Sequence, residues 1–478
     1  MNYRMIKNVL GWILWFEAIF MLVPSVTAMV YGEWRELLFF FATMAICALL
    51  GLLCRLGKPR DTVLYAREGF VIVSLSWIVL SLFGALPLFL SGWIPNYIDA
   101  LFETVSGFTT TGSSILASVE ELPRSILMWR SFTHWVGGMG VLVFIMAFVP
   151  LSGGQNMHIM RAESPGPDVS KLVPRVRTTA LILYAIYLGM TFIMFILLLL
   201  GDMTAFEALN TSFATAGTGG FGFCNDSMAS FSPYVQIVVT VFMLLFSVNF
   251  TCYYMLFLGR VKEVLNTELR AFAIIVAGAV TVVTLNIVSM YQNVGDALRH
   301  AAFSVATVIS TTGFATENFD LWPELSRTVL VLLMFVGACA GSTGGGIKIS
   351  RIQILIRGAF NSIGDLIHPR RVKKVMLDKR PVDRTVVQAT NVYMVWYLLI
   401  FVASVILISF DDHDLVTNFT AVAATLNNVG PGLGKVGPTG NFAFFSIPSK
   451  LVLIFDMLAG RLELFPMLVL FAPSTWKR

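Results

Sequence analysis

The chain has 478 residues, of which 56% are hydrophobic and only 13% are charged. Charged residues make up about a quarter of an ordinary soluble domain, so this composition excludes a soluble globular enzyme, a disordered chain and a nucleic-acid-binding domain. The formal net charge of +5 becomes informative only when the charges are located along the chain.

Apolar runs of about 20 residues, long enough for a helix to cross a hydrocarbon core of about 30 Å, recur along the whole chain. They predict an all-α polytopic protein of the lipid bilayer. The first run follows a basic N-terminus, and Val26-Thr27-Ala28 resembles a signal-peptide cleavage site. The run is longer than a typical signal core, so we interpret it as an uncleaved membrane helix. The ten candidate spans are 10–31, 36–54, 69–92, 131–151, 178–201, 233–258, 269–291, 326–347, 386–410 and 448–472.

Connections rich in Lys and Arg alternate with connections that are poor in them. Basic residues in short loops favour the cytoplasmic side of the membrane. One orientation satisfies every loop, and it places both termini in the cytoplasm. The basic connections are 55–68, 152–177, 259–270 and 348–385, and the poorer ones lie around 32–35, 93–130, 202–232, 292–325 and 411–447.

Four of the outward connections share one pattern. Each begins with an apolar segment too short to cross the bilayer, continues through a turn rich in small or polar residues, and then reaches the next span. The central glycines, Gly112, Gly219, Gly313 and Gly430, are 107, 94 and 117 residues apart, which indicates a fourfold internal repeat. The short segments are Asn96–Phe108, Thr204–Thr215, Gly295–Val308 and Asp414–Thr425. The predicted division is two N-terminal helices (1–60) and four repeats (69–152, 178–260, 269–360 and 386–478).

The four turns predict one ion pathway with pseudo-fourfold symmetry. Non-helical backbone at membrane depth is tolerated only where it is buried in protein or lines a water-filled cavity. Glycine allows successive carbonyl groups to turn inward, and a ring of carbonyls can replace the hydration shell of a monovalent cation. The short helices would direct their negative C-terminal ends to the same place. The alternative is that the turns are only tight connectors, and their recurrence in all four repeats argues against it. The candidate ion-binding residues are Thr110, Thr111, Gly112, Gly217, Thr218, Gly219, Thr311, Thr312, Gly313, Asn428, Val429 and Gly430.

A glycine-rich segment interrupts the span that begins near Ser326. Half of the residues in 337–346 are glycine, and Lys348 follows them. Each glycine costs about 1 kcal/mol in a helix relative to alanine, so we expect the helix to unwind there. The segment lacks the spacing of a phosphate-binding Walker loop. The open alternatives are a functional intramembrane loop and close helix packing by small residues.

Arg461 lies inside the last span, and Glu463 follows two residues later. A charge within a membrane is costly, so its default interpretation is functional. The alternative is an arginine that extends to the cytoplasmic end of the helix or pairs with a carboxylate.

The turn motifs resemble the potassium-transporter superfamily that includes the bacterial Trk and Ktr membrane subunits and the plant HKT transporters, with TrkH-type subunits the most similar. The motifs that carry the resemblance are Thr-Thr-Thr-Gly (109–112), Ser-Thr-Thr-Gly-Phe (310–314) and Asn-Asn-Val-Gly-Pro-Gly (427–432). The resemblance implies four membrane–pore–membrane units around one filter with a single filter glycine per repeat. It also implies a homodimer and potassium uptake across the bacterial inner membrane. Plant relatives with serine at the first filter position are associated with sodium transport, so Gly112 favours potassium. A sodium or non-selective monovalent cation transporter remains the alternative.

The same resemblance implies a gate and a regulatory partner. The glycine-rich segment would obstruct the pore and move on gating, and Arg461 would face the pore and restrain cations. The basic stretch 348–385 would dock a cytosolic nucleotide-binding ring of the TrkA type, unless it reflects only positive-inside bias and anionic lipid. This chain has no nucleotide fingerprint, so ATP or NAD sensing would belong to that partner. No cofactor is predicted, and K⁺ is the transported ion. The candidate gate residues are Gly341, Gly344, Gly345, Gly346, Lys348 and Arg461.

A membrane-embedded enzyme is the alternative from another class. Its best candidate site is Asp411-Asp412-His413-Asp414, a potential metal site at an outward helix end. Acidic residues near a helix N-terminus commonly stabilise the helix dipole instead. The five cysteines lack metal-type spacing, and the HExxH and GxSxG motifs are absent. The sequence therefore favours transport over catalysis.

Overall fold

The computed structural model describes residues 1–56, 65–140, 176–368, 374–378 and 380–477. These residues form a helical bundle with one short hairpin, in which β1 (Met376–Leu377) pairs antiparallel with β2 (Arg380–Pro381). Among the described residues, six helices are long and apolar enough to cross a membrane, or seven if one bent pair is counted as a span. The predicted all-α membrane fold is confirmed.

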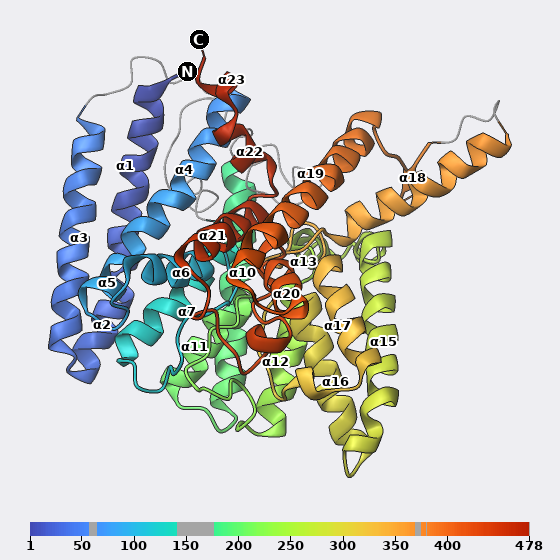
Figure 1. Cartoon of the computed structure of the whole chain (residues 1–478), viewed down its shortest axis with the longest axis horizontal. Coiled ribbons are helices and arrows are strands. Elements are labelled where there is room, and N and C mark those ends of the chain that lie inside the picture. The colour runs from blue at the N-terminus through green and yellow to red at the C-terminus, as the bar shows by residue number, and fades with distance from the viewer. Residues whose placement is uncertain (57–64, 141–175, 369–373, 379, 478) are drawn as a thin grey trace.

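The N-terminal part of the chain forms a helical hairpin beside the repeats (Figure 1). Its first arm is α1 (Tyr3–Phe20), continued by α2 (Leu22–Tyr31), and its second arm is α3 (Trp34–Arg55). Gly32, at the end of α2, has a φ of +72°, a left-handed conformation that glycine adopts without a steric penalty. The chain reverses there, as the sequence predicts.

Each repeat contains a short helix where the sequence predicts one, and we call these four helices the pore helices. The residue at the N-cap of each accepts a hydrogen bond from a backbone N–H of the first turn, which satisfies a donor that would otherwise be unpaired. The predicted segments agree with the observed helices to within one residue at each end. The N-caps and pore helices are Asn96 and α6 (Tyr97–Phe108), Thr204 and α11 (Ala205–Ala216), Asn293 and α16 (Val294–Ile309), and Asp414 and α20 (Leu415–Leu426).

A long helix precedes each pore helix. In the first repeat it runs directly into a short continuation, α5 (Leu86–Leu90). The long helices are α4 (Ala66–Gly84), α10 (Val176–Leu199), α15 (Thr267–Ile287) and α19 (Arg384–Ile408).

The helix after the pore helix is broken in the second, third and fourth repeats, which the sequence predicts only for the third. The predicted span 131–151 of the first repeat lies partly outside the described residues. The candidate spans 233–258 and 448–472 each contain a break that the sequence does not predict. In the second repeat the axis bends by 91°, because Asn249 caps a new helix by accepting a hydrogen bond from the Thr251 N–H. In the fourth repeat Glu463 and Leu464 adopt positive φ values of 56° and 65°. The helices are α7 (Arg124–Gly138), α12 (Pro233–Phe246) with α13 (Phe250–Phe257), α17 (Glu324–Val336), and α21 (Ile447–Arg461) with α22 (Phe465–Phe471).

The third repeat ends in α18 (Ile349–Ile367), which projects from the bundle (Figure 1). Both termini lie at one end of the molecule, and the connections of the pore helices lie at the other. The remaining short elements are α14 (Val261–Val264), α23 (Pro473–Trp476) and the 3₁₀ turns η1 (Val288–Met290), η2 (Phe319–Leu321), η3 (Ser409–Asp411) and η4 (Gly434–Val436).

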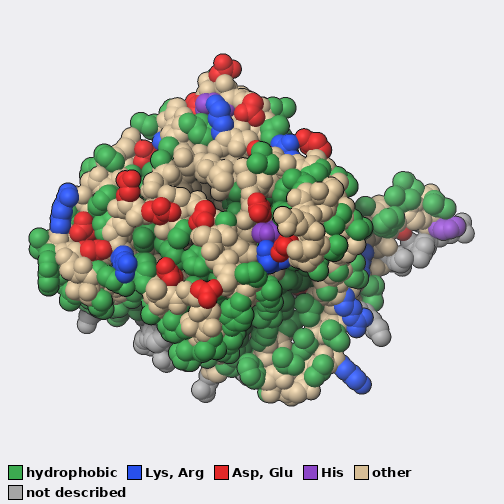
Figure 2. Space-filling view, turned by 90° about the horizontal axis from the view of Figure 1, so that it is seen from below, with side chains coloured by type: hydrophobic (Ala, Val, Ile, Leu, Met, Phe, Trp, Pro, Cys, Tyr) green, Lys and Arg blue, Asp and Glu red, His purple; other side chains and the backbone are tan. Residues whose placement is uncertain are grey.

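The end of the molecule opposite the termini is acidic. The connections at this end contain sixteen Asp and Glu residues against seven Lys and Arg. Figure 2 shows acidic side chains distributed over this face around a central hollow. A cation approaching the hollow therefore meets a negative surface. The connections counted are 32–36, 91–130, 201–232, 291–327 and 411–450.

Candidate ion pathway

The four pore helices end in the same backbone motif. One residue after each C-cap, the chain enters the left-handed region, with φ between 54° and 59°. The following N–H donates to a carbonyl five residues earlier at 2.8–2.9 Å, and the left-handed residue donates to a carbonyl three residues earlier at 2.9–3.2 Å. This is the Schellman ending of a helix. The left-handed residues are Thr110, Thr218, Thr311 and Asn428.

Three of these left-handed residues are threonines, although glycine is the usual choice. A positive φ is a genuine outlier for a β-branched residue, and such backbone strain costs of order 1–3 kcal/mol. Because the same strained conformation recurs in repeats of different sequence, the fold maintains it in all four. Strain of this kind clusters at functional sites.

A glycine follows two residues after each left-handed residue, and it too has a positive φ. The values are 83° for Gly112, 75° for Gly220, 91° for Gly313 and 101° for Gly430. The sequence predicts Gly219 as the equivalent glycine of the second repeat. The backbone conformation shows that the equivalent residue is Gly220, one position later. Gly219 matches Thr111, Thr312 and Val429 instead. We call Gly112, Gly220, Gly313 and Gly430 the glycine ring.

The glycine ring closes around one axis. A Cβ atom added to Gly112 would lie 2.0 Å from the carbonyl oxygen of Gly219, and one added to Gly220 would lie 2.0 Å from that of Thr312. The contacts continue from Gly313 to the carbonyl of Val429 at 2.6 Å and from Gly430 to the carbonyl of Thr111 at 2.8 Å. Each glycine therefore abuts the carbonyl that precedes the glycine of the next repeat, in the order 1, 2, 3, 4 and back to 1. The structure brings the four turns together.

A cavity of about 190 Å³ opens on this ring from the acidic end of the molecule, and all four ring glycines line it. Gly219 and the left-handed residues are not among the residues that line it. We call this cavity the outer vestibule. It connects the ring with the face shown in Figure 2.

The hydroxyl groups beside the ring are engaged with neighbouring protein groups. The hydroxyl of Thr111 lies 2.8 Å from that of Thr109, and the hydroxyl of Thr312 lies 2.7 Å from that of Ser310. In the second repeat Thr218 donates to the carbonyl of Gly217 at 2.6 Å. Backbone carbonyls are therefore the polar groups that all four repeats place beside the ring.

The glycine-rich segment forms an irregular loop after α17, and we call residues 337–348 the glycine loop. Gly337, Gly341 and Gly346 have φ values between 68° and 76°, a conformation that breaks the helix as predicted. The Gly345 N–H donates to the hydroxyl of Thr311 at 2.6 Å, and the Gly346 N–H donates to the carbonyl of Asn427 at 3.0 Å. The loop is therefore attached to the C-terminal ends of the third and fourth pore helices.

Close packing at the glycine loop requires the absence of side chains. A Cβ atom on Gly344 would lie 2.8 Å from the carbonyl oxygen of Ser310, and one on Gly345 would lie 2.3 Å from that of Asn427. The small residues of the segment therefore allow an irregular loop, and not a continuous helix, to pack closely against the ends of two pore helices.

Arg461 connects three parts of the pathway. Its guanidinium donates to the hydroxyl of Thr110 at 3.2 Å, to the carbonyl of Thr343 at 2.8 Å and to the carbonyls of Gly137 and Gly138, the latter at 2.8 Å. The guanidinium of Arg461 thus contacts the turn after the first pore helix, the glycine loop and the end of α7. Glu463 forms its ion pair with Arg351.

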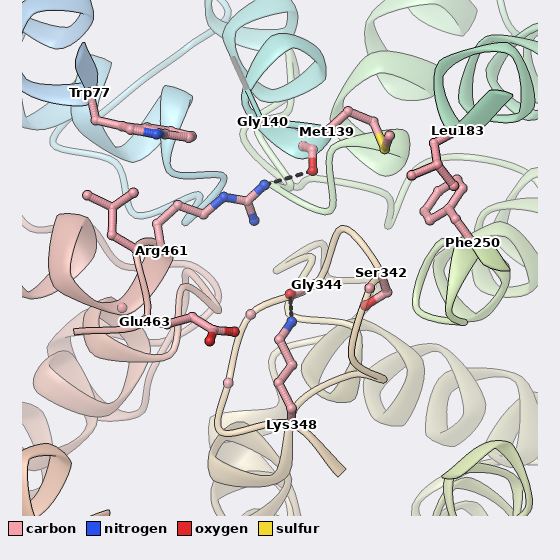
Figure 3. A pocket seen from close by; sticks show the side chains of 16 residues that line it. Trp77, Met139, Gly140, Leu183, Phe250, Ser342, Gly344, Lys348, Arg461 and Glu463 are labelled. Carbon is pink, nitrogen blue, oxygen red and sulfur yellow. Dashed lines mark hydrogen bonds between the residues drawn. The ribbon is translucent and has the colours of Figure 1, made fainter. Parts of the chain in front are cut away.

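A second cavity, of about 90 Å³, lies at the glycine loop. Figure 3 shows Arg461 extending along one side of it and Lys348 extending from the loop toward Gly344. Lys348 is 2% exposed and donates to the carbonyl of Gly344. A cavity of this size has room for several water molecules, and two basic side chains border it.

Glu268 contacts the glycine loop, and the sequence did not indicate it as a site residue. Its carboxylate oxygen accepts the Ala340 N–H at 2.8 Å and the Ser350 N–H at 3.1 Å. It joins the start of α15 to the glycine loop and to the first turn of α18. A carboxylate just before the apolar span 269–291 was the available signal, but such residues are common at helix starts.

The acidic cluster at 411–414 supports local structure. Asp414 caps α20 by accepting the Thr417 N–H at 2.9 Å, and Asp411 accepts the Ser446 N–H at 2.8 Å. Hydrogen bonds from the side chain and the backbone of Thr417 hold the pKa of Asp414 below its ordinary value. Within the described part of the chain, no three His, Cys, Asp or Glu residues are grouped closely enough to hold a metal ion.

Comparison with known proteins identifies the family. The family described as TrkH, cation transport protein, matches residues 35–478. The chain is 36% identical to the Trk system potassium uptake protein TrkH of Salmonella typhimurium, with all of both chains covered, and 31% identical to TrkG of Escherichia coli, with 100% and 99% covered. The crystal structure of the potassium transporter TrkH from Vibrio parahaemolyticus matches with a TM-score of 0.89 and 33% identity, and it covers all of both chains. The chain therefore belongs to the TrkH family of cation transport proteins.

Proposed function

We propose that the chain takes up potassium across the inner membrane of a bacterium through one pore that passes the glycine ring. The observation that carries the proposal is the closure of the ring, in which each ring glycine abuts a backbone carbonyl of the next repeat, through all four repeats and back to the first. Carbonyl rings replace the hydration shell of a monovalent cation without a full counter-charge. The relatives named as potassium uptake proteins support potassium as the ion.

The direction of flux follows from the membrane potential. A potential of 100 mV contributes about 2.3 kcal/mol for each charge that crosses, which is about 1.7 decades of accumulation for a monovalent cation. No coupling reaction is then required for uptake. The acidic outer face would raise the local concentration of cations at the vestibule.

Ion uptake by purified protein in lipid vesicles tests this proposal. We expect rubidium, used as a tracer for potassium, to enter vesicles with a negative interior, and excess sodium to compete poorly. An imposed proton gradient should leave the initial rate unchanged at constant membrane potential. A sodium flux equal to the rubidium flux would contradict potassium selectivity, and dependence on the proton gradient would contradict channel-like flow.

The proposed gate consists of the glycine loop, Lys348 and Arg461. The loop is attached directly to two pore helices, and the two basic side chains border the cavity beside it. A cation leaving the ring would meet positive charge and a narrow passage. Movement of the loop away from Thr311 and Asn427 would open the path.

Substitution of Glu268 by glutamine tests whether the loop attachment restrains flux. A hydrogen bond to a charged group contributes about 1.5–3 kcal/mol, so loosening the two N–H contacts should raise basal rubidium flux about tenfold. Glu263→Gln is the matched control, because Glu263 is an exposed residue five positions earlier, on α14, that contacts Arg260. Basal flux that is unchanged in Glu268→Gln, in protein that is folded and inserted, would remove Glu268 from the gate.

We also propose that the chain acts as a homodimer, with both termini in the cytoplasm, and binds a cytosolic nucleotide-binding ring of the TrkA type. The basic stretch 348–385 and the projecting helix α18 support a cytoplasmic docking surface. Sensing of ATP or NAD would belong to that partner. Movement of α18 would reach the glycine loop directly, because α18 begins at Ile349, the residue after Lys348.

A further inference from the structure

A buried ion pair lies behind the first filter turn. Glu103 of α6 is 1% exposed and Arg130 of α7 is 3% exposed. The Arg130 Nη2 atom lies 2.7 Å from Glu103 Oε1, and its Nε donates to the same oxygen at 2.9 Å. Removing two charges from water costs several kcal/mol for each ion, and further hydrogen bonds are needed to recover that cost.

The remaining polar atoms of the pair contact the segments that follow two ring glycines. Glu103 Oε2 accepts the Ile115 N–H at 3.0 Å, and the hydroxyl of Ser114 donates to Oε1 at 3.0 Å. These two residues follow Gly112 by two and three positions.

Arg130 extends the contact to the second repeat. Its Nη1 donates to the carbonyl of Gly222 at 3.1 Å, and its guanidinium lies 4.2 Å from the centroid of the Phe221 ring. Phe221 and Gly222 directly follow Gly220. One ion pair therefore holds the segments after two neighbouring ring glycines, and Arg130 also lines the outer vestibule.

The pair breaks the pseudo-fourfold symmetry. Glu103 lies seven residues before the left-handed Thr110. The residues at the same position before Thr218, Thr311 and Asn428 are Thr211, Ser304 and Ala421, and none of them is ionisable. A buried ion pair therefore connects the first and second repeats. The other repeats have no ionisable residue at the position that corresponds to Glu103.

We propose that the Glu103–Arg130 pair is a specificity-determining element that positions the carbonyls of Thr111 and Gly219 for potassium. The inference rests on the proposed function and adds residues outside the ring to it. Selection between potassium and sodium depends on the number and placement of carbonyl ligands. Because the ion pair holds two neighbouring turns in place, it limits how far their carbonyl oxygens can move inward to coordinate a smaller ion.

The test compares rubidium and sodium fluxes through vesicles that contain wild-type protein, Arg130→Lys or Glu103→Gln. Lysine keeps the charge but loses the planar fork that contacts both repeats, and glutamine keeps the shape but loses the charge. We expect each variant to lower the rubidium-to-sodium flux ratio about tenfold, the scale of one charge-assisted hydrogen bond. The ratio should fall because sodium flux rises while rubidium flux persists.

Ser114→Ala and Arg327→Gln complete the design. Ser114→Ala removes the hydroxyl that donates to Glu103 and accepts from the Leu116 N–H, but it leaves both charges paired. It therefore keeps the test decisive if the other variants fail to fold, and we expect a fall of about threefold. Arg327→Gln breaks a pair with Asp320 and Glu324 on the same face and should leave the ratio unchanged.

The two proposals fail in different ways. Absence of cation flux in wild-type protein would contradict the proposed function itself. Selective wild-type flux together with an unchanged flux ratio in folded Ser114→Ala, Arg130→Lys and Glu103→Gln would overturn the role of the pair and leave the pore intact. A lower total flux at constant ratio would show that the pair supports only the fold.

Discussion

Alanine at Gly220 is expected to reduce rubidium flux at least about a hundredfold, an effect of about 2.7 kcal/mol. The added Cβ would lie 2.0 Å from the carbonyl oxygen of Thr312, far inside van der Waals contact. The backbone at Gly220 also has a φ of +75°, a conformation that costs a side-chain-bearing residue of order 1–3 kcal/mol. The ring must therefore widen or unwind at its second repeat.

The four ring glycines should respond in a graded order. Gly112→Ala and Gly220→Ala place the new atom at 2.0 Å from a carbonyl oxygen, whereas the distance is 2.6 Å for Gly313→Ala and 2.8 Å for Gly430→Ala. We expect the largest losses in the first pair and the smallest in Gly430→Ala. The measurement is rubidium flux per inserted molecule.

Gly278→Ala is the matched control for this series. Gly278 lies in α15, and a Cβ there would meet no atom within 4 Å. Its flux should equal that of the wild type, and its helix should gain slightly in stability, since alanine is the better helix former. Wild-type flux in Gly220→Ala would contradict both the corrected register and the role of the ring.

Alanine at Arg461 is expected to raise basal flux about tenfold to a hundredfold. A unit charge about 6 Å from a passing ion contributes about 3 kcal/mol at an effective dielectric constant of 20. Removal of the guanidinium also releases its contacts with Thr110, Thr343 and the end of α7. Both effects favour passage of a cation.

Arg461→Lys separates the two effects. Lysine preserves the charge but cannot reproduce the fork that reaches several acceptors. If charge is the main barrier, Arg461→Lys should stay close to wild-type flux while Arg461→Ala leaks; if attachment of the loop dominates, both should leak. Unchanged or lower basal flux in folded Arg461→Ala would rule out a barrier role for this residue.

Local signals predicted the pore helices accurately. Asn96, Thr204 and Asp414 are good N-cap residues, and each is followed by an apolar segment that is too short to cross a bilayer. The structure places the N-caps at these positions. Such boundaries depend on residues close in sequence, so the sequence alone was sufficient to find them.

The register of the turn after the second pore helix depends on contacts between residues far apart in the sequence. Gly219 and Gly220 are adjacent, and a pattern of Thr followed by Gly selects the first of them. Which glycine faces the next repeat is decided by packing between repeats: a Cβ on Gly219 would meet the His134 ring at 2.1 Å, whereas one on Gly220 would meet the carbonyl of Thr312 at 2.0 Å. Both positions require glycine, for different reasons.

The breaks in α12–α13 and α21–α22 were missed for a similar reason. The helix break at 337–346 is rich in glycine and was predicted, but the other two breaks contain Asn249 and the pair Glu463 and Leu464. These residues leave the helix because of tertiary contacts: the Phe250 N–H donates to the carbonyl of Gly341 at 3.0 Å, and Glu463 pairs with Arg351. Helix propensity does not include such contacts.

The pairing of Glu103 with Arg130 also could not be predicted from the periodicity of the sequence. Glu103 lay within a predicted pore helix and Arg130 just before a predicted span. In the sequence, each residue alone is compatible with a solvated position on a helix. Only the packing of α6 against α7 shows that both are buried and paired.

The most direct test of the central claim is the position of a heavy potassium analogue. Crystals of the full chain grown with rubidium or thallium ions should show anomalous density on the axis of the glycine ring, surrounded by the carbonyl oxygens of Thr111, Gly219, Thr312 and Val429. Sodium should not displace this density at equal concentration. Density found only away from the ring, in crystals that contain the ion at saturating concentration, would contradict the account.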